Sequence, residues 1–252
     1  MTPPDFDVVA KRADALAALV EAQLPMVADV AGVHQAWPLV CPALLSHATS
    51  TLRSIVLLGP AGAHTDASRL LRSLYDHVVT FAWLAADPSA ERLAVWRLED
   101  LAQRLKAVRE MAEAGEPILD DAARDEMERE LDAATKTTTP DLAAKALAAD
   151  RYWAPRVEAL NDTRLGTFRG MYTVLFRSHS GLVHATFRGL NAVVEDLSPT
   201  RRRVLARPPL DGRGAYGMAT IVHGLGLLVA AKALGWPSEA DVHSVFDTYP
   251  LR

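Results

Sequence analysis

The chain has 252 residues, of which half are hydrophobic, 6% aromatic and 23% charged, the composition of a soluble globular protein. Its net charge of −4 excludes a global attraction to nucleic acid, so any such binding would need a local basic patch. A single cysteine, Cys41, excludes an internal disulfide and a cysteine-rich zinc site. Residues 1–7 lack the basic region of a signal peptide, so we expect a cytoplasmic protein.

In the first half of the chain, apolar residues at helical spacing are bounded by proline, glycine and capping residues. They predict helices over residues 5–31, 42–58, 66–86 and 89–114. Thr65 is the expected N-cap of the third helix. Because only residues 87–89 join the third and fourth helices, we expect these two to pack as an antiparallel pair.

The second half of the chain is also mainly helical. We predict a highly charged helix with little buried surface at 120–134, and further helices at 140–149, 163–191 and, towards the C-terminus, within 213–248. Residues 151–160 read as irregular, and residues 193–206 as one short β-hairpin. The sequence therefore predicts an all-α, single-domain bundle of about eight to ten helices, with helices 213–248 packing on the rest.

The uncharged run 215–231 is at the lower edge of the length that spans a bilayer. It contains Thr220, His223 and several glycines, and it lacks a flanking basic bias. We therefore expect a buried core helix and no membrane association.

A polar stripe runs along the predicted helix 163–191. At 3.6 residues per turn, Arg177, Ser180, His184 and Arg188 fall on one side of it, among large apolar residues. Such a stripe needs either a polar partner inside the fold or a ligand.

The predicted helix 66–86 carries a second polar group. Arg72 and Asp76 are spaced i,i+4 with apolar neighbours, which predicts a half-buried pair on one face. Two interpretations stay open: an internal ion pair that fixes helix packing, or part of a functional pocket.

The segments RLLRSLYDHVVTFAWLAADP and YTVLFRSHSGLVHATF together resemble a bacterial family of uncharacterised all-helical proteins. Members show an arginine with an acidic residue four positions later on one helix, and an aromatic residue, a serine and a histidine on another. In this sequence those positions are Arg72, Asp76, Tyr172 or Phe176, Ser180 and His184. The resemblance covers about residues 65–190 and implies a polar cluster shared between two helices. The acidic position is usually glutamate, so Asp76 is a shorter version.

A looser resemblance is to HEPN domains, helical modules of toxins and phage-defence ribonucleases that carry an Arg-x4–6-His motif, often completed across a dimer. Arg177 and His184 fit this motif, and so do Arg72 and His77. The resemblance implies metal-independent RNA cleavage, in which His184 handles the proton of the attacking 2′-hydroxyl or of the leaving oxygen. Arg177 would stabilise the charge of the phosphorane.

The remaining polar residues indicate no metal site and no cofactor. The histidines lack metal-ligand spacing within one helix, and the acidic residues of 120–130 read as a solvated face. The basic cluster Arg201, Arg202 and Arg203 is the candidate contact for RNA, or else a solvated turn. The expected partners are thus a second copy of the chain and RNA.

Three functions remain open for the cluster of Arg72, Asp76, Tyr172, Ser180 and Arg188 with Arg177 and His184. The first is a HEPN-like ribonuclease site in which Arg177 and His184 are catalytic. The second is a non-catalytic site for a ligand or partner, and the third is an internal network that fixes the packing of two helices. Exposure separates them, because a catalytic histidine must be accessible and a structural one must be buried with its partners.

Overall fold

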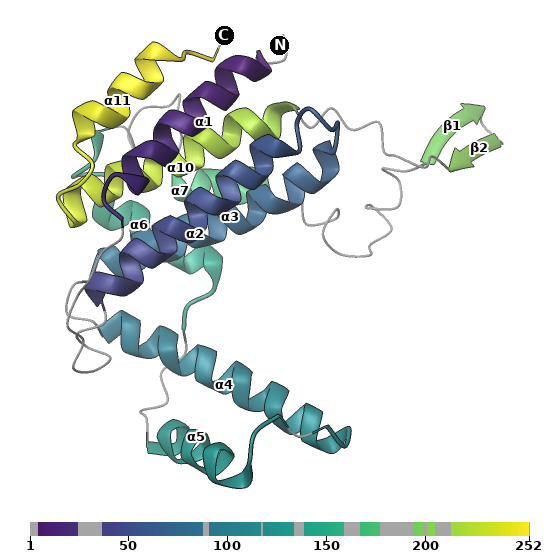
Figure 1. Ribbon diagram of the computed structural model, residues 1–252, viewed down its shortest axis with the longest axis vertical. Helices are drawn as coiled ribbons and strands as arrows, with labels where there is room; N and C mark the ends of the chain where they lie inside the picture. Colours follow the sequence, from purple (N-terminus) through teal and green to yellow (C-terminus); the bar gives the residue numbers. More distant parts are fainter. Residues whose placement is uncertain are drawn as a thin grey trace.

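The computed structural model describes the chain in nine stretches, and all statements below concern these residues: 5–24, 37–87, 91–116, 118–133, 139–158, 167–176, 194–198, 201–204 and 213–251. The predicted all-α architecture with one short hairpin is confirmed. Figure 1 shows a helical body from which a pair of helices and a small hairpin project in different directions.

The centre of the body is α3 (His64–Ala85), which packs against α2 (Trp37–Leu57), α10 (Arg213–Ala233) and α6 (Leu142–Trp153). Every residue from 78 to 86 is buried, because neighbouring helices cover this half of α3 on several sides. A helix that is apolar all round can only be stable inside a fold. α3 therefore organises the core.

α10 is the second core helix. It is the one described helix long and apolar enough to cross a membrane by length and composition, and 78% of its apolar window is buried inside the protein. A Cβ on Gly226 would lie 3.2 Å from Val78 Cγ1, and one on Gly224 would collide with the ring of Phe246. These glycines let α10 approach α3 and α11 (Glu239–Thr248) closely, as expected for helix–helix contact points.

Arg12 of α1 (Phe6–Glu21) is a buried cation that ties the two ends of the chain together. Its Nη2 donates to the carbonyl oxygen of Tyr249, and its guanidinium lies 4.7 Å from the centre of the Phe246 ring. Burial lowers the pKa of Arg12 to about 10. α1 thereby holds α11 against the body, a contact that helical periodicity does not reveal.

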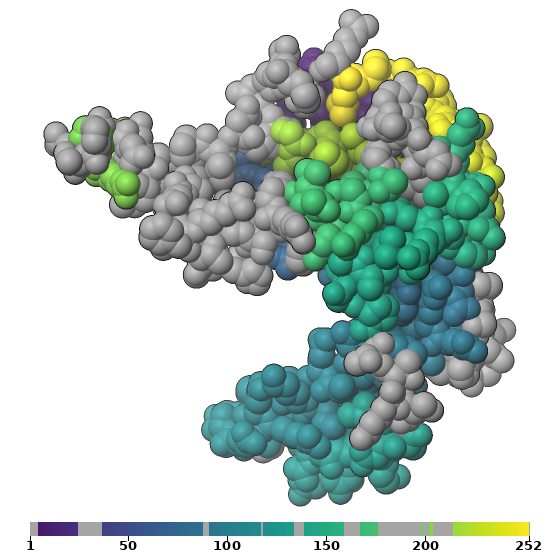
Figure 2. Space-filling view, turned by 180° about the vertical axis from the view of Figure 1, so that it is seen from behind, coloured from purple at the N-terminus to yellow at the C-terminus, as the bar shows by residue number. Residues whose placement is uncertain are grey.

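The projecting arm consists of α4 (Glu91–Glu113) and α5 (Asp121–Ala133) (Figure 1). The expected antiparallel packing of α3 on α4 is wrong: Figure 2 shows the arm standing away from the body over most of its length. Buried residues on α4 beyond its first turn are confined to Leu101, Leu105 and Val108, a narrow stripe that faces α5.

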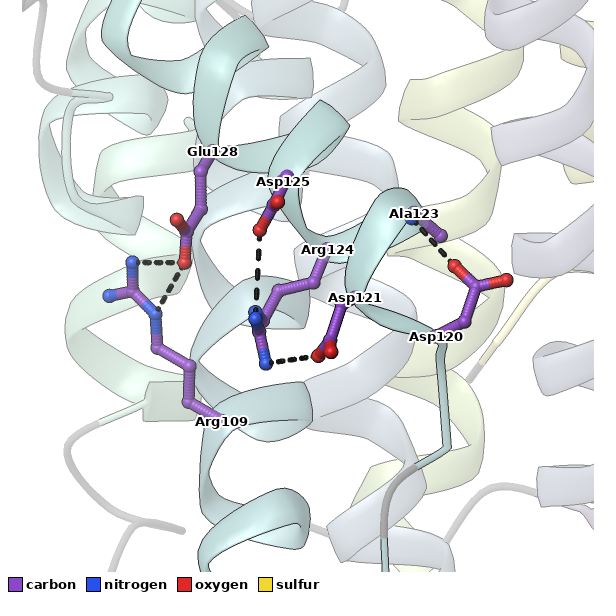
Figure 3. A network of polar contacts seen from close by, with 7 residues as sticks. All are labelled: Arg109, Asp120, Asp121, Ala123, Arg124, Asp125 and Glu128. Carbon is purple, nitrogen blue, oxygen red and sulfur yellow. Dashed lines mark hydrogen bonds and ion pairs between the residues drawn. The ribbon is translucent and has the colours of Figure 1, made fainter.

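Ion pairs on the arm's surface supplement this apolar stripe (Figure 3). Arg109 of α4 binds Glu128 Oε1 of α5 at 2.8 Å, and Arg124 pairs with Asp121 within α5. α5 has no buried residue, as its charge predicted. Because each exposed ion pair contributes about 0–1 kcal/mol, we expect the arm to be less stable than the body.

The hairpin pairs β1 (Val194–Ser198) with β2 (Arg201–Val204) in antiparallel register. It lies within residues 193–206, as predicted. Glu195 is opposite Arg203 and Asp196 is opposite Arg202. Directly opposed residues are paired by the backbone of the two strands.

Candidate functional site

The two segments predicted to share a polar cluster do meet within the described residues. Tyr75 of α3 is fully buried, and its hydroxyl donates a hydrogen bond of 2.5 Å to the carbonyl oxygen of Phe168. Phe168 begins α7 (Phe168–Met171), which continues into a single π-helical turn, η3 (Tyr172–Phe176). Burial raises the pKa of Tyr75, and the nearby Asp150 carboxylate adds to the increase.

Asp150 of α6 holds the N-terminus of α7. Its two carboxylate oxygens accept hydrogen bonds from the backbone N–H groups of Phe168 and Arg169 at 2.9 and 2.8 Å. The hydroxyl of the N-cap Thr167 accepts from Gly170 N at 3.0 Å. A carboxylate at a helix N-terminus satisfies amides that have no partner inside the helix. Burial raises the pKa of Asp150, and these backbone hydrogen bonds oppose that increase.

Replacing Asp150 by alanine should lower the free energy of unfolding by about 2 kcal/mol, because two backbone donors lose a charged acceptor. The measurement is urea-induced unfolding of the full chain. Asp132→Ala, a change to an exposed carboxylate of α5, is the matched control and should have little effect. Equal midpoints for the two variants would show that the Asp150 contacts contribute nothing to stability.

Of the predicted site residues, the structure describes three. Arg72 is partly buried, whereas Asp76 is exposed and accepts a hydrogen bond of 3.3 Å from Thr80 Oγ1. The expectation of a half-buried position is therefore wrong for Asp76, whose side chain is exposed. Tyr172 is partly buried, and the Arg169 guanidinium lies 5.3 Å from the centre of its ring. Arg177, Ser180, His184 and Arg188 lie outside the described residues.

A pair of histidines beside Asp76 was not singled out from the sequence. The rings of His47 on α2 and His77 on α3 have centroids 5.8 Å apart. Nδ1 of His77 is buried and has no hydrogen-bond partner in the described structure. Burial lowers the pKa of His77, with Asp76 opposing and His47 reinforcing the decrease. A neutral imidazole with an unused ring nitrogen can accept a proton. The sequence pattern that could have pointed to His77 is the Arg72-x4-His77 spacing.

The structure also bears on metal binding and on the basic cluster. Among the described side chains, no group of three histidine, cysteine, aspartate or glutamate residues could hold a metal ion. In the hairpin, Arg202 and Arg203 are exposed, and the register sets them opposite Asp196 and Glu195.

The described architecture defines an all-helical protein in which one buried helix, α3, supports a short helix with a π turn. Residues 39–200 match DUF5677, a family of unknown function, and the chain belongs to this family. The matched region runs from α2 to β1 and is wider than the expected 65–190. No curated protein and no solved structure matches the chain.

The family match confirms the resemblance to an uncharacterised helical family that the two motifs indicated. It does not support the HEPN resemblance, and it does not show a bacterial origin. The function of the site must be argued from its own chemistry.

Proposed function

We propose that the protein is a HEPN-like, metal-independent ribonuclease of the toxin or phage-defence type, with Arg177 and His184 as its catalytic residues. The observation that carries the proposal is the anchored segment that leads into Arg177. Its π turn ends at Phe176, directly before Arg177 in the chain. π-helical turns are rare and are frequently found at functional sites.

The chemistry requires two groups. His184 takes the proton of a ribose 2′-hydroxyl, whose oxygen then attacks the adjacent phosphorus atom. The bond from phosphorus to the 5′-oxygen breaks, this oxygen takes a proton from water, and His184 returns its own proton to the resulting hydroxide. The products end in a 2′,3′-cyclic phosphate and a 5′-hydroxyl. Arg177 stabilises the negative charge of the phosphorane. In this proposal a homodimer completes the site, and the hairpin residues Arg201, Arg202 and Arg203 contact the RNA backbone.

The competing function is a non-catalytic module in which the cluster is a structural network. A structural carboxylate is expected to be buried with its hydrogen bonds satisfied. Asp76 is exposed instead. An exposed carboxylate on α3, next in the chain to the Tyr75 that anchors α7, favours the catalytic role over a buried structural network.

The test is cleavage of a defined RNA oligonucleotide by purified protein in the presence of EDTA. We expect Arg177→Ala and His184→Ala each to reduce the rate by about 100-fold or more. Arg53→Ala on α2 and His243→Ala on α11 change exposed residues of the same types and should retain wild-type activity.

His77→Ala distinguishes the second Arg-x4–6-His match from the first. If Arg177 and His184 are catalytic, His77→Ala retains most of the activity. RNA that stays intact with the wild-type protein, or cleavage that the two catalytic variants do not slow, would exclude the ribonuclease function. Growth and RNA integrity in expressing bacteria give the corresponding readout in cells.

A further inference from the structure

A pocket with aromatic walls lies where the start of α2 and the ends of α3, α6 and α10 meet. Its volume is about 530 Å³, within the range of about 300–1,000 Å³ that is typical of small-molecule sites. The described lining consists of Trp37, Ala85, Tyr152, Trp153, Arg156, Lys232 and Ala233. None of these residues belongs to the proposed ribonuclease site.

The two indole rings of the pocket are fixed by the backbone of α3. Trp153 Nε1 donates to the carbonyl oxygen of Ala82 at 2.8 Å, and Trp37 Nε1 donates to that of Leu84 at 3.2 Å. Tyr152 lies edge-to-face with Trp153, with ring centroids 4.7 Å apart. Trp153 is buried, so the accessible ring surface of the pocket belongs to Trp37 and Tyr152, which are partly exposed. Because the indole N–H of Trp37 is already used, this ring offers a ligand its π surface only. Rigid aromatic surfaces of this kind bind planar rings by stacking.

Two cations stand beside these rings. The Arg156 guanidinium lies 4.0 Å from the centre of the Tyr152 ring, and its Nη1 donates to the Tyr152 carbonyl oxygen at 2.5 Å. Within the described residues this carbonyl is its one hydrogen-bond partner, so other N–H donors of Arg156 can bind an anion. Lys232 Nζ pairs with Glu239 at 2.5 Å. The described lining itself contains no acidic side chain.

We propose that this pocket binds a nucleotide, with the base stacked on the aromatic walls and the phosphate bound by Arg156. A nucleotide carries a planar ring and an anion on one small molecule. The aromatic walls of the pocket complement the ring, and its basic side complements the anion. Arginine suits the anionic half, because its planar guanidinium stacks on a ring and donates to phosphate oxygens at the same time. The nucleotide is either free or part of an RNA strand.

The experiment titrates the full-length protein with AMP, GMP, CMP and UMP, following tryptophan fluorescence and heat of binding. We expect at least one of them to bind, and the corresponding nucleoside to bind at least tenfold more weakly. Arg156→Gln should weaken nucleotide binding at least tenfold and leave nucleoside binding unchanged. Trp37→Leu should weaken both. Arg53→Gln removes an exposed arginine of α2 and serves as the control that binds like wild type.

A short 2′-O-methyl oligonucleotide, which cannot be cleaved through its 2′-oxygen, separates the two sources of the ligand. If it binds at least as tightly as the mononucleotides and Arg156→Gln weakens it, the pocket takes a nucleotide within a strand. Binding of mononucleotides alone assigns the site to free nucleotides. No binding of either kind at millimolar concentration, or equal binding by wild type and Arg156→Gln, overturns the proposal. Arg177→Ala and His184→Ala should bind nucleotide as tightly as the wild-type protein. Nucleotide binding at the pocket is therefore tested separately from the proposed ribonuclease activity.

Discussion

Replacing Tyr75 by alanine should lower the free energy of unfolding by about 3–5 kcal/mol, the usual cost of deleting a large buried aromatic side chain. Tyr75 is fully buried in the centre of α3, and its hydroxyl donates to Phe168 at the start of α7. The substitution removes packing area, leaves a cavity and deprives a backbone carbonyl of its donor. Urea-induced unfolding of the purified chain measures the change.

Tyr75→Phe separates packing from the hydrogen bond. It keeps the ring and should cost about 1–3 kcal/mol, because the carbonyl of Phe168 is left without its donor. Leu57→Ala, at an apolar residue of α2 that is 76% exposed, should cost little and is the control for truncation. If Tyr75→Phe is as stable as wild type, the contact does not hold α7 on α3. RNA cleavage should fall with Tyr75→Phe under native conditions, while nucleotide binding at the aromatic pocket, which Tyr75 does not line, stays unchanged.

Helix ends that depend on local chemistry could be predicted from the sequence. Ser238, a residue type favoured at N-caps, caps the last helix in a reciprocal capping box with Asp241. Gly115 follows the end of α4 with a φ of +85°, a conformation that costs glycine little. Asp5 caps α1 by accepting a hydrogen bond from Asp7 N. Such signals act within a few residues and need no knowledge of the fold.

Helix ends set by tertiary contacts were misjudged. α3 begins at His64 rather than after Thr65, and the imidazole of His64 lies 2.8 Å from the hydroxyl of Tyr216 on α10. α6 continues to Trp153, well beyond the predicted end at 149, because the indole of Trp153 is buried and bonded to α3. α2 starts at Trp37 and contains Pro42, whose ring near the first turns removes only one helical hydrogen bond.

The candidate site was only partly predictable for the same reason. Spacing placed Arg72 and Asp76 on one helix, but it could not show that Asp76 would be exposed while Arg72 is partly buried. The His47–His77 pair joins two helices, and the aromatic pocket draws Trp37, Trp153 and Lys232 from three helices far apart in sequence. Periodicity reports which face of a helix is apolar, and it contains no information about which faces meet.

Acid should destabilise the protein through His223, the fully buried histidine of α10. Burial lowers the pKa of His223 to about 4, from an ordinary value of 6.5, and no charged group contributes to the shift. Its Nε2 lies 2.9 Å from Thr49 Oγ1, which donates to the Leu45 carbonyl oxygen, and its Nδ1 has no partner in the described structure. The folded state therefore holds this imidazole neutral.

Because the pKa is lower in the folded chain, the unfolded chain binds more protons between pH 6.5 and 4, and stability is lost as the pH falls through this window. The difference between the two pKa values, 6.5 and about 4, corresponds to about 3 kcal/mol. Urea-induced unfolding of wild type and His223→Gln should therefore be compared at pH 7 and pH 4. Glutamine keeps a polar group near Thr49 and does not titrate, so the stability difference between the two proteins should shift by about 3 kcal/mol in favour of the variant at low pH. Parallel pH profiles would mean that His223 titrates with the same pKa in the folded and the unfolded chain, so that its burial does not penalise the charged form.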